Sequence, residues 1–565
     1  MGQLASGLAE TWRYAGLVVR ETWLRTTRRG AIGRLTAISF GGTPPNRLLV
    51  APTDLHAADP IEADHLLSGI FSLADGVLET DGASPFELEP PTEAFAEALM
   101  SFSWLRQLRA RRDEETGLYA RQMVLSFLRH HGRISGPAWQ TDVVARRLIA
   151  LLSHSTVILR GADTGFYRRF LKAIGRHERH LRAEWRTMPI GETRLNTAIA
   201  LAMASICVDL PETRRNAAAR RLDFELESQI LADGGHVSRN PQVLLRLLFE
   251  LLPLRQTYIN LNLPLPKRLV PAIDRIYPAL RFFRHRDGDL ALFNSATPTL
   301  ATELSAILRY DESGGHPFRA LPHTGFHRLE AGATVVIVDT GEPLSIELSK
   351  TAHAGASAFE MSAGSSRFVV NSGLPHFASA EIRSAVRATA AHSAVTLENT
   401  SSMRFSHSDY LGPVATSGVS IVEVARESDA DGEDQLRMRH DGYLGRFGLF
   451  CRRTISLSAD GGRLTGRDSF TRKAGGPPPE NEEAIAVARF HIHPSIWITR
   501  ESESEILLTA PDSTSFLFSV PGANADIEDD VFFASSAGPR PSRQIAVPFR
   551  LGTSPEILWT FERQS

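Results

Sequence analysis

The chain of 565 residues contains only two cysteines, Cys207 and Cys451, and neither lies in a CxxC pair. This scarcity excludes a disulfide framework and a thiolate metal site, and it predicts two buried, unreactive thiols. Long apolar runs are also missing. The longest run, residues 197–208 (TAIALAMASICV), is too short to span a bilayer and is typical of a buried helix.

The sequence also lacks an excess of charge of either sign. Its 62 lysines and arginines nearly balance its 64 aspartates and glutamates, which gives a formal net charge of −2. This balance argues against attraction of the whole protein to nucleic acid, so we expect no nucleic-acid partner.

Residues 1–30 lack the uninterrupted apolar segment of a signal peptide, because Glu10, Arg13, Arg20 and Glu21 interrupt it. Their apolar residues instead recur at helical spacing, with arginines between them. Such an amphipathic helix could rest on a membrane surface as a peripheral contact, or dock on the protein itself. We favour docking.

Length and periodicity together indicate a multidomain α+β protein. Between residues 93 and 310 apolar side chains recur at i, i+3, i+4 and i+7, which predicts helices paired in a toroid or a solenoid. After residue 310 the period becomes two, in short β-branched or aromatic segments bounded by Gly, Asp or Ser. We therefore expect a β-sandwich of antiparallel sheets over residues 311–565, and an amphipathic helix with a mixed segment over 1–92.

Three stretches of the C-terminal half carry a resemblance to a known family. They read LPHTGFHRLEAGATVVIVDTG, HAGASAFEMSAGSSRFVVNSG and RATAAHSAV. Following a helical array in this order, they resemble motifs of the heparinase II/III family of polysaccharide lyases, in which the second stretch reads HADALSFEL…DPG and the third R-x-T-x-x-H-N-T. The resemblance spans residues 93–565 and implies an N-terminal helical (α/α) toroid over 93–310, followed by a C-terminal antiparallel β-sandwich.

The resemblance also implies a function, the cleavage of an acidic, uronate-containing polysaccharide by β-elimination. A base removes the C5 proton of the uronate and an acid protonates the leaving oxygen. Family members supply an Asn-His pair and a tyrosine from the toroid. Here residues 191–194 read Gly-Glu-Thr-Arg in place of the pair, and the tyrosine position falls near Gln242 and Val243. A protein that binds envelope or capsule glycan without cleaving it is therefore the alternative. The family often works in the periplasm, whereas this sequence shows no clear export signal.

The loop DGGHVSRNPQV over residues 233–243 supplies candidates on the helical side. His236 is the candidate catalytic base in place of the missing tyrosine, and Tyr258 is the candidate acid. Arg239 offers a planar fork suited to a uronate carboxylate. The other candidate substrate-binding residues are Asn240, Glu192 and Arg194. The structural alternative is a helix cap at Asn240 with solvated charges, and a simple ion pair between Glu192 and Arg194.

On the β side, His353, Asn371 and His392 occupy the positions of a small metal site in some family members. Zinc requires three or four strong ligands, and the Asn371 amide replaces the expected carboxylate. We therefore predict no firm cofactor and favour a hydrogen-bonded cluster over bound zinc. Two core histidines bonded to backbone are the plain alternative. Because only small residues flank His353, we expect its imidazole to face the cleft and contact substrate, as a third candidate catalytic residue that donates or accepts a proton.

Overall fold

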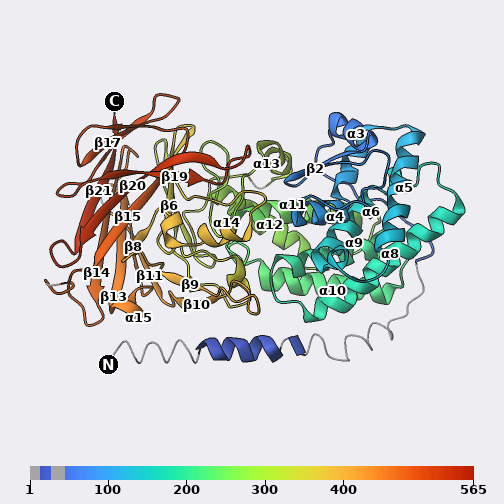
Figure 1. Cartoon of the computed structure of the whole chain (residues 1–565), viewed down its shortest axis with the longest axis horizontal. Helices are drawn as coiled ribbons and strands as arrows, with labels where there is room; N and C mark the ends of the chain where they lie inside the picture. Colours follow the sequence, from blue (N-terminus) through green and yellow to red (C-terminus); the bar gives the residue numbers. More distant parts are fainter. Residues whose placement is uncertain are drawn as a thin grey trace.

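The computed structural model of the protein describes residues 13–23, 25–26, 45–312, 314–429, 431–480 and 482–564. A helical half and a β half lie next to each other along the longest axis of the molecule (Figure 1). This arrangement confirms the predicted order of a helical region followed by antiparallel sheets. Among the described residues, every helix is too short or too polar to cross a bilayer.

The helical half contains a small hairpin and a succession of helices joined by short loops. Thr92, Asp113 and Asp163 begin three of these helices, since each side chain accepts a hydrogen bond from the backbone N–H three residues later. The elements are α3 Pro60–Leu67, β1 Ile70–Leu73, β2 Gly76–Glu79, α4 Glu93–Ser101, η1 Ser103–Ala110, α5 Glu114–His131, η2 Pro137–Trp139, α6 Thr141–Ser153, α7 Ser155–Ile158, α8 Thr164–Glu184, η3 Trp185–Thr187, α9 Glu192–Cys207, α10 Glu212–Gln229, α11 Pro241–Asn260, α12 Leu269–Phe282 and α13 Ala301–Leu308.

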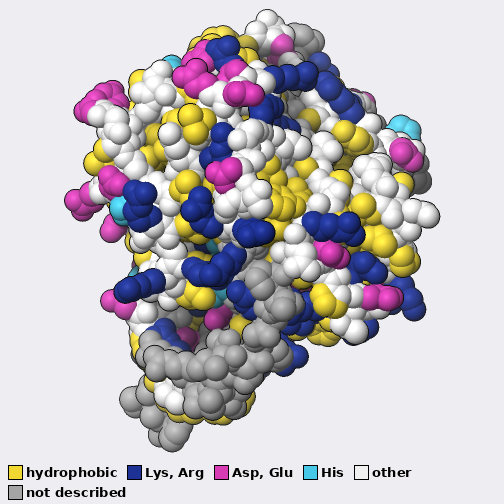
Figure 2. All heavy atoms as spheres, turned by 90° about the vertical axis from the view of Figure 1, so that its right-hand side faces the viewer, with side chains coloured by type: hydrophobic (Ala, Val, Ile, Leu, Met, Phe, Trp, Pro, Cys, Tyr) yellow, Lys and Arg dark blue, Asp and Glu magenta, His cyan; other side chains and the backbone are white. Residues whose placement is uncertain are grey.

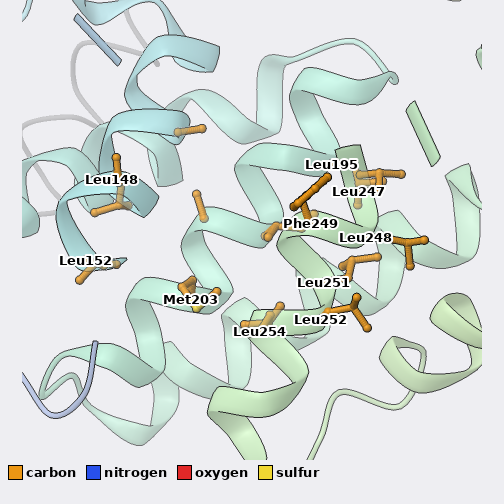
Figure 3. Packing of buried hydrophobic residues seen from close by; sticks show 14 of the residues in the cluster. Leu148, Leu152, Leu195, Met203, Leu247, Leu248, Phe249, Leu251, Leu252 and Leu254 are labelled. Carbon is orange, nitrogen blue, oxygen red and sulfur yellow. The ribbon is translucent and has the colours of Figure 1, made fainter. Parts of the chain in front are cut away.

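Helix α9 is the central element of the helical core. It is buried on every side from Thr197 to Cys207, which is why its sequence is a continuous run of small and apolar residues. Leucines of α6 and α11 pack against it (Figure 3). Each fully buried leucine contributes about 1.5–3 kcal/mol relative to an exposed one. Cys207 and Cys451 are buried and free, as predicted.

Within the described residues, the β half contains an eight-stranded and a nine-stranded antiparallel sheet. The eight-stranded sheet has the order β11 Val422–Ser428, β12 Asp434–His440, β13 Leu449–Leu457, β14 Arg463–Arg472, β21 Glu556–Gln564, β18 Ser515–Ser519, β17 Glu505–Thr509 and β16 Trp497–Arg500. The nine-stranded sheet has the order β19 Asp526–Phe532, β20 Arg540–Arg550, β15 Ile485–Ile492, β7 Ser366–Val370, β6 Phe359–Ala363, β5 Thr334–Asp339, β4 Phe326–Ala331 and β3 Ala320–Leu321, with β8 Val395–Leu397 also paired to β15.

Shorter elements lie beside the sheets. They are η4 Leu348–Thr351, α14 Ala380–Ala385, η5 Thr389–Ala391, the pair β9 Met403–Phe405 and β10 Ala415–Gly418, and α15 Leu444–Phe447.

Strand β5 joins the two halves, because its alternate residues belong to two hydrophobic cores. Val335 and Ile337 belong to the core of the helical half, whereas Val336 and Val338 belong to the core between the sheets. Both faces of the strand are therefore buried, which explains its unbroken apolar sequence. The shared core also holds the two halves in a fixed relation, so the cleft between them rests on rigid elements.

Residues 13–23 and 25–26 are helical and pack against the β half. Leu17 is buried with Leu411 and Val414, and the Arg25 guanidinium lies 4.2 Å from the centre of the Tyr410 ring. This part of the predicted amphipathic helix therefore docks on the protein. The rest of the predicted segment, residues 1–12 and 27–44, lies outside the described residues.

Candidate functional site

A cavity of about 910 Å³ opens between the helical half and the β half. The start of α9, the start of α11 and residues 295–297 form its helical wall. Residues 347–351, 374–387 and 405–413 form the opposite wall. The volume of this interdomain cleft is in the range of ligand-binding clefts.

An ion pair fixes the helical wall of the cleft. Arg246 of α11 donates to both carboxylate oxygens of Glu192 of α9, at 2.7 and 2.8 Å. Burial alone would raise the pKa of Glu192, but the Arg246 charge lowers it below its usual value. Arg246 also donates to Gln242 Oε1 at 3.1 Å. Glu192 therefore lines the cleft with Arg246 as its partner.

Asn240 lies on the same wall and caps α11. Its Oδ1 accepts from the backbone N–H of Gln242 at 2.9 Å, and Pro241 takes the first helical position. His236 lies behind this wall and is nearly inaccessible. Its Nε2 is 3.1 Å from Gln229 Oε1, and its Nδ1 is 2.8 Å from Ser238 Oγ. Burial lowers the pKa of His236 to about 4. A neutral, enclosed imidazole supports the loop and does not reach a substrate in the cleft, contrary to the prediction of a base here.

Arg239 does not present its fork to the cleft, and this corrects the prediction of a carboxylate-binding arginine. The guanidinium donates to the carbonyl oxygens of Thr324, Gly325 and Glu342 at 2.8, 3.1 and 3.3 Å. It also forms an ion pair with Asp339 of β5. Arg239 therefore ties the 233–240 loop to the β half.

Two further candidates lie away from the cleft. Arg194 forms an ion pair with the buried Glu225 at 2.7 Å, so neither the predicted contact with substrate nor a pair with Glu192 is present. Tyr258 is buried 17 residues beyond the start of α11. At 1.5 Å per residue, this places it roughly 25 Å along the helix from Pro241 and about 18 Å from Arg246, which lines the cleft. Tyr258 is therefore too far away to act as the predicted acid.

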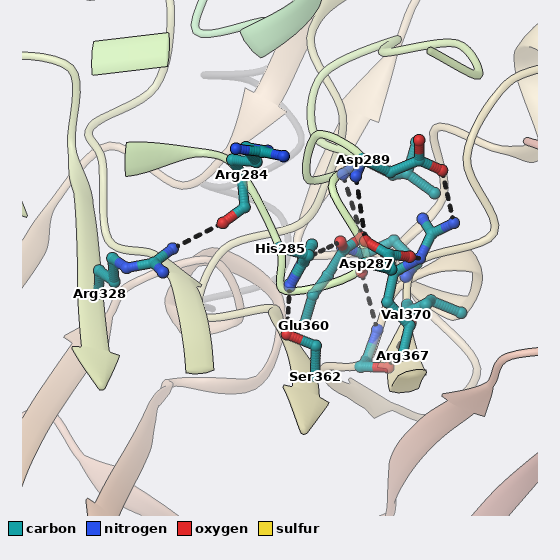
Figure 4. A network of polar contacts seen from close by, with 12 residues as sticks. Arg284, His285, Asp287, Asp289, Arg328, Glu360, Ser362, Arg367 and Val370 are labelled. Atoms are coloured by element: carbon teal, nitrogen blue, oxygen red, sulfur yellow. Dashed lines mark hydrogen bonds and ion pairs between the residues drawn. The ribbon is translucent and has the colours of Figure 1, made fainter. Parts of the chain in front are cut away.

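On the β side, His353, His392 and Asn371 converge in a row of hydrogen bonds. His353 Nδ1 lies 3.3 Å from His392 Nε2, and His392 Nδ1 lies 3.2 Å from Asn371 Oδ1. The row continues inward, because Asn371 Nδ2 donates to Glu360 Oε1 at 3.0 Å. The other oxygen of Glu360 meets His285 Nε2 at 3.0 Å, and His285 also contacts Ser362 (Figure 4). All members from His392 to Ser362 are buried.

At its outer end the row reaches the cleft through Ser295, not through His353 itself. Ser295 Oγ lies 2.9 Å from His353 Nε2 and lines the cleft, whereas His353 is only 8% exposed. Burial also holds the pKa of His353 well below its usual value. The imidazole was predicted to face the cleft, but Ser295 lies between it and the cleft.

Comparison with known proteins places these features in a family. Residues 313–560 match the family model described as Heparinase II/III-like, C-terminal. Over 550 residues the chain is 30% identical to the FtsZ-localized protein C of Caulobacter vibrioides (strain NA1000 / CB15N), and the match covers 93% of each chain. The chain belongs to the heparinase II/III-like family.

Solved structures share the fold of this family member. The crystal structure of heparinase III superposes with a TM-score of 0.72 at 12% identity, covering 97% of this chain and 92% of that one. The heparan sulfate lyase HepC from Pedobacter heparinus superposes with a TM-score of 0.60 at 15% identity, covering 95% and 88%. These likenesses support the toroid-plus-sandwich architecture of a polysaccharide lyase fold.

The family's metal positions do not fit a metal ion in this chain. A zinc site requires three or four ligand atoms that surround one point about 2 Å away. Here His353 and Asn371 contact opposite ring nitrogens of His392, so the three side chains form a line. The Asn371 oxygen also accepts from the backbone N–H of Ser393 at 3.2 Å. No group of three or more His, Cys, Asp or Glu among the described residues is arranged to hold a metal.

Several cleft residues could not be singled out in the sequence. The cations Lys350 and Arg383 line the β wall, and Arg387 holds this wall by donating to the carbonyls of Ala352 and Ser349 at 2.7 and 2.6 Å. Lys350 lies in η4 and Arg383 in α14, and these elements of four and six residues are too short to show a periodicity in the sequence. Ser295 lies in an Asn-Ser turn between two helices, and only that dipeptide hints at a special backbone.

Proposed function

We propose that the protein binds an acidic polysaccharide in the interdomain cleft. The observation that supports this most is that two cations, Lys350 and Arg383, line the β wall of a cavity of about 910 Å³, whereas Arg246 on the helical wall is paired with Glu192. Two cations on one wall can contact successive carboxylate or sulfate groups of one chain. The cations on the outer surface of the helical half are more dispersed, since Figure 2 shows Lys and Arg side chains spread across that end of the molecule.

Binding without the family's usual elimination agrees with the lining of the cleft. Among the described residues that form it there is no tyrosine, and Glu192 with Arg246 occupies the region where the resemblance places an Asn-His pair. The Glu192 carboxylate would repel a uronate if Arg246 did not neutralise it. The pair therefore leaves this wall close to neutral and does not provide an acid or a base.

One observation favours β-elimination as a second candidate function. The exposed imidazoles of His376 and His407 line the same cleft as Arg246, Lys350 and Arg383. A histidine beside cations that neutralise a uronate carboxylate could remove the C5 proton. Cleavage would produce an unsaturated uronate, which absorbs in the ultraviolet.

A panel of acidic glycans tests both functions. Titration calorimetry with the Lys350→Ala/Arg383→Ala variant should show affinity weakened by at least about tenfold, because each lost charge-assisted hydrogen bond costs about 1.5–3 kcal/mol. Arg467→Ala is the matched control, since Arg467 is an exposed arginine on β14 paired with Glu556. Equal affinities for the three proteins would refute cleft binding. Growth of the unsaturated-uronate absorbance, lost in His376→Ala or His407→Ala, would establish elimination.

The docked N-terminal helix supports a proposal of peripheral membrane contact. Leu17 packs on the protein, whereas Val19 and Trp23 are 69% and 65% exposed. Exposed apolar side chains beside arginines are typical of a helix that rests in a lipid headgroup layer. Co-sedimentation with vesicles containing anionic lipid should be reduced by Val19→Glu and unchanged by Val77→Glu, an exposed valine of β2. Equal sedimentation of both variants would refute this contact.

A further inference from the structure

The Ser295 hydroxyl lies between the cleft and a buried imidazole. Its Oγ is 2.9 Å from His353 Nε2 and 3.0 Å from the carbonyl oxygen of Thr351. A hydroxyl has one proton, so it can donate to only one of these acceptors at a time. Which one receives the proton decides whether His353 acts on Ser295 as an acceptor or as a donor.

The buried end of the row fixes the direction of its hydrogen bonds. Glu360 can only accept, so the Asn371 amide nitrogen faces it, and the backbone N–H of Ser393 independently identifies the Asn371 oxygen. Because that oxygen lies beside His392 Nδ1, this nitrogen must carry a proton. His392 is 2% exposed and its two ring nitrogens face an amide oxygen and another imidazole, with no described anion in contact to balance a charged ring, so the ring is neutral and its Nε2 is an acceptor.

The same reasoning carries outward to the cleft. His392 Nε2 accepts from His353 Nδ1, which leaves Nε2 of a neutral His353 without a proton. The Ser295 hydroxyl must therefore donate to His353 Nε2. This is the arrangement of a nucleophilic serine with its base: hydroxyl and imidazole within hydrogen-bond distance, and the ring oriented from its other nitrogen.

The backbone at Ser295 is strained, which is common at functional sites. Asn294 and Ser295 have φ values of +48° and +67°, in the left-handed region that serine rarely adopts. The Asn294 side chain holds the turn, because its oxygen accepts from the backbone N–H of His353 and its nitrogen donates to the Arg239 carbonyl, both at 3.3 Å. The turn thus places Oγ between His353 and the cleft.

We propose that Ser295 is the nucleophile of an acyl hydrolase and that His353 is its general base. The substrate class is an ester, such as an O-acyl substituent on a sugar. Ser295 Oγ forms a bond to the ester carbonyl carbon while its proton passes to His353 Nε2. The bond to the alcohol oxygen breaks, and the alcohol leaves with that proton. A water then attacks the acyl carbon, returns a proton through His353, and releases the carboxylic acid and free Ser295.

Other groups near Ser295 suit this chemistry. The Glu360 carboxylate can stabilise the positive charge that His353 gains during the reaction, because His392 and Asn371 connect the two side chains by hydrogen bonds. Lys350 lines the same cleft and supplies a cation for the developing negative charge on the carbonyl oxygen. The proposal goes beyond glycan binding, because any small ester that enters the cleft can react.

A fluorophosphonate reagent, which phosphonylates activated serines, tests the assignment on the full chain. Mass spectrometry should find one adduct on Ser295, and Ser295→Ala should remove it. Ser384→Ala is the matched control, since Ser384 also lines the cleft and no described imidazole contacts its hydroxyl. His353→Gln should react at least about 100-fold more slowly, as expected for a lost base. Release of p-nitrophenolate from p-nitrophenyl acetate should follow the same order.

Three results would overturn the proposal: no adduct on the wild-type protein, an adduct that survives Ser295→Ala, or a folded His353→Gln variant that reacts at the wild-type rate. If His353→Gln does not fold, the comparison of Ser295→Ala with Ser384→Ala still decides, because each change removes one hydroxyl oxygen. Glycan affinity measured on Ser295→Ala separates the two functions. Loss of labelling in Ser295→Ala supports the nucleophile both where the variant retains glycan affinity and where the wild-type protein binds no glycan.

Discussion

The β half contains two buried polar assemblies that differ in how they end. In the first, Arg453 donates to both oxygens of Asp468 at 2.6 and 2.9 Å, and Trp559 donates to the same carboxylate at 2.9 Å. The remaining Arg453 donor reaches the carbonyls of Ser357 and Ser393. The second is the row from His285 through Glu360 to Ser295. The first assembly is closed inside the core, whereas the second ends at the cleft.

This difference separates a structural role from a functional one. A closed assembly has its donors and acceptors matched within the protein, so it contributes to the fold and offers nothing to a ligand. The open row has a polar atom at its outer end that a ligand can reach. Ser393 belongs to both assemblies, since its carbonyl accepts from Arg453 and its N–H donates to Asn371. Ser393 thereby connects the row to the core between the two sheets.

The largest effect should come from removing the carboxylate of the closed assembly. Asp468→Ala leaves the Arg453 charge buried without a partner, which should lower the free energy of unfolding by about 3–5 kcal/mol. Denaturant titration measures this loss. Glu556→Ala is the control, because Glu556 forms an exposed pair with Arg467 on the neighbouring strand and should cost at most about 1 kcal/mol. Similar losses for the two variants would show that burial does not distinguish the assemblies.

The elements of both halves could be predicted from sequence because their signals are local. The period of 3.6 in the helices, the period of two in the strands and the Asn240 cap each involve residues close in the chain. The order of the motifs predicted the family, and the family in turn predicted a helical toroid followed by a β-sandwich. It also brought His353, Asn371 and His392 together correctly, as a row.

The failures concern contacts between residues that are distant in sequence. Arg239 reads as a free fork in the sequence, but Asp339, 100 residues later, occupies it. Arg194 similarly meets Glu225 across two helices. Ser295 has no signal beyond an Asn-Ser turn, because its role depends on a histidine 58 residues away. Side-chain partners of this kind follow from tertiary packing, and periodicity does not reveal them.

The next largest effect should be a loss of stability in acid. Burial lowers the pKa of His236 to about 4, whereas an unfolded histidine has a pKa near 6.5. Between these values the unfolded state binds more protons than the folded state, so the free energy of unfolding falls as pH falls. The loss should begin near pH 6.5 and reach about 3 kcal/mol for His236 by roughly pH 4.

Urea unfolding between pH 7 and pH 4 checks this contribution. His236→Gln removes the titrating group. The free energy of unfolding lost between pH 7 and pH 4 should therefore be smaller by about 3 kcal/mol in this variant. His65→Gln, at a side chain that is 46% exposed, is the control and should retain the loss due to His236. A His236→Gln variant with the wild-type slope would show that His236 is not held neutral.

A smaller effect is expected when the open row receives a second negative charge. Asn371→Asp places a carboxylate oxygen about 3 Å from Glu360 Oε1, in the position of the donating amide. Two carboxylates at this distance cannot both ionise without cost, so the free energy of unfolding should fall by about 2 kcal/mol at pH 7. The deficit should shrink below pH 5, when the pair can share a proton. Denaturant titration at both pH values measures this difference, and an unchanged stability would contradict the direct contact.

The zinc content of the wild-type protein tests the contrast between this row of side chains and the family's metal sites. Because His353 and Asn371 lie on opposite sides of His392, wild-type protein should contain much less than one zinc per chain. Elemental analysis after chelator treatment checks this. A full, chelator-resistant equivalent of zinc in the wild type would mean that the imidazoles reorient around an ion.

The smallest effect should come from Tyr258→Phe. The Tyr258 hydroxyl is buried in the helical half, burial raises its pKa to about 12, and it lies about 18 Å along α11 from Arg246, which lines the cleft. Removing one hydroxyl from such a position should change the free energy of unfolding by about 1 kcal/mol or less, because the ring remains to fill the core. Glycan affinity and fluorophosphonate labelling should both stay at wild-type values. A tenfold loss in either, with the melting temperature unchanged, would mean that α11 transmits changes from its far end to the cleft. The row and the cleft cations would then be only part of the functional site.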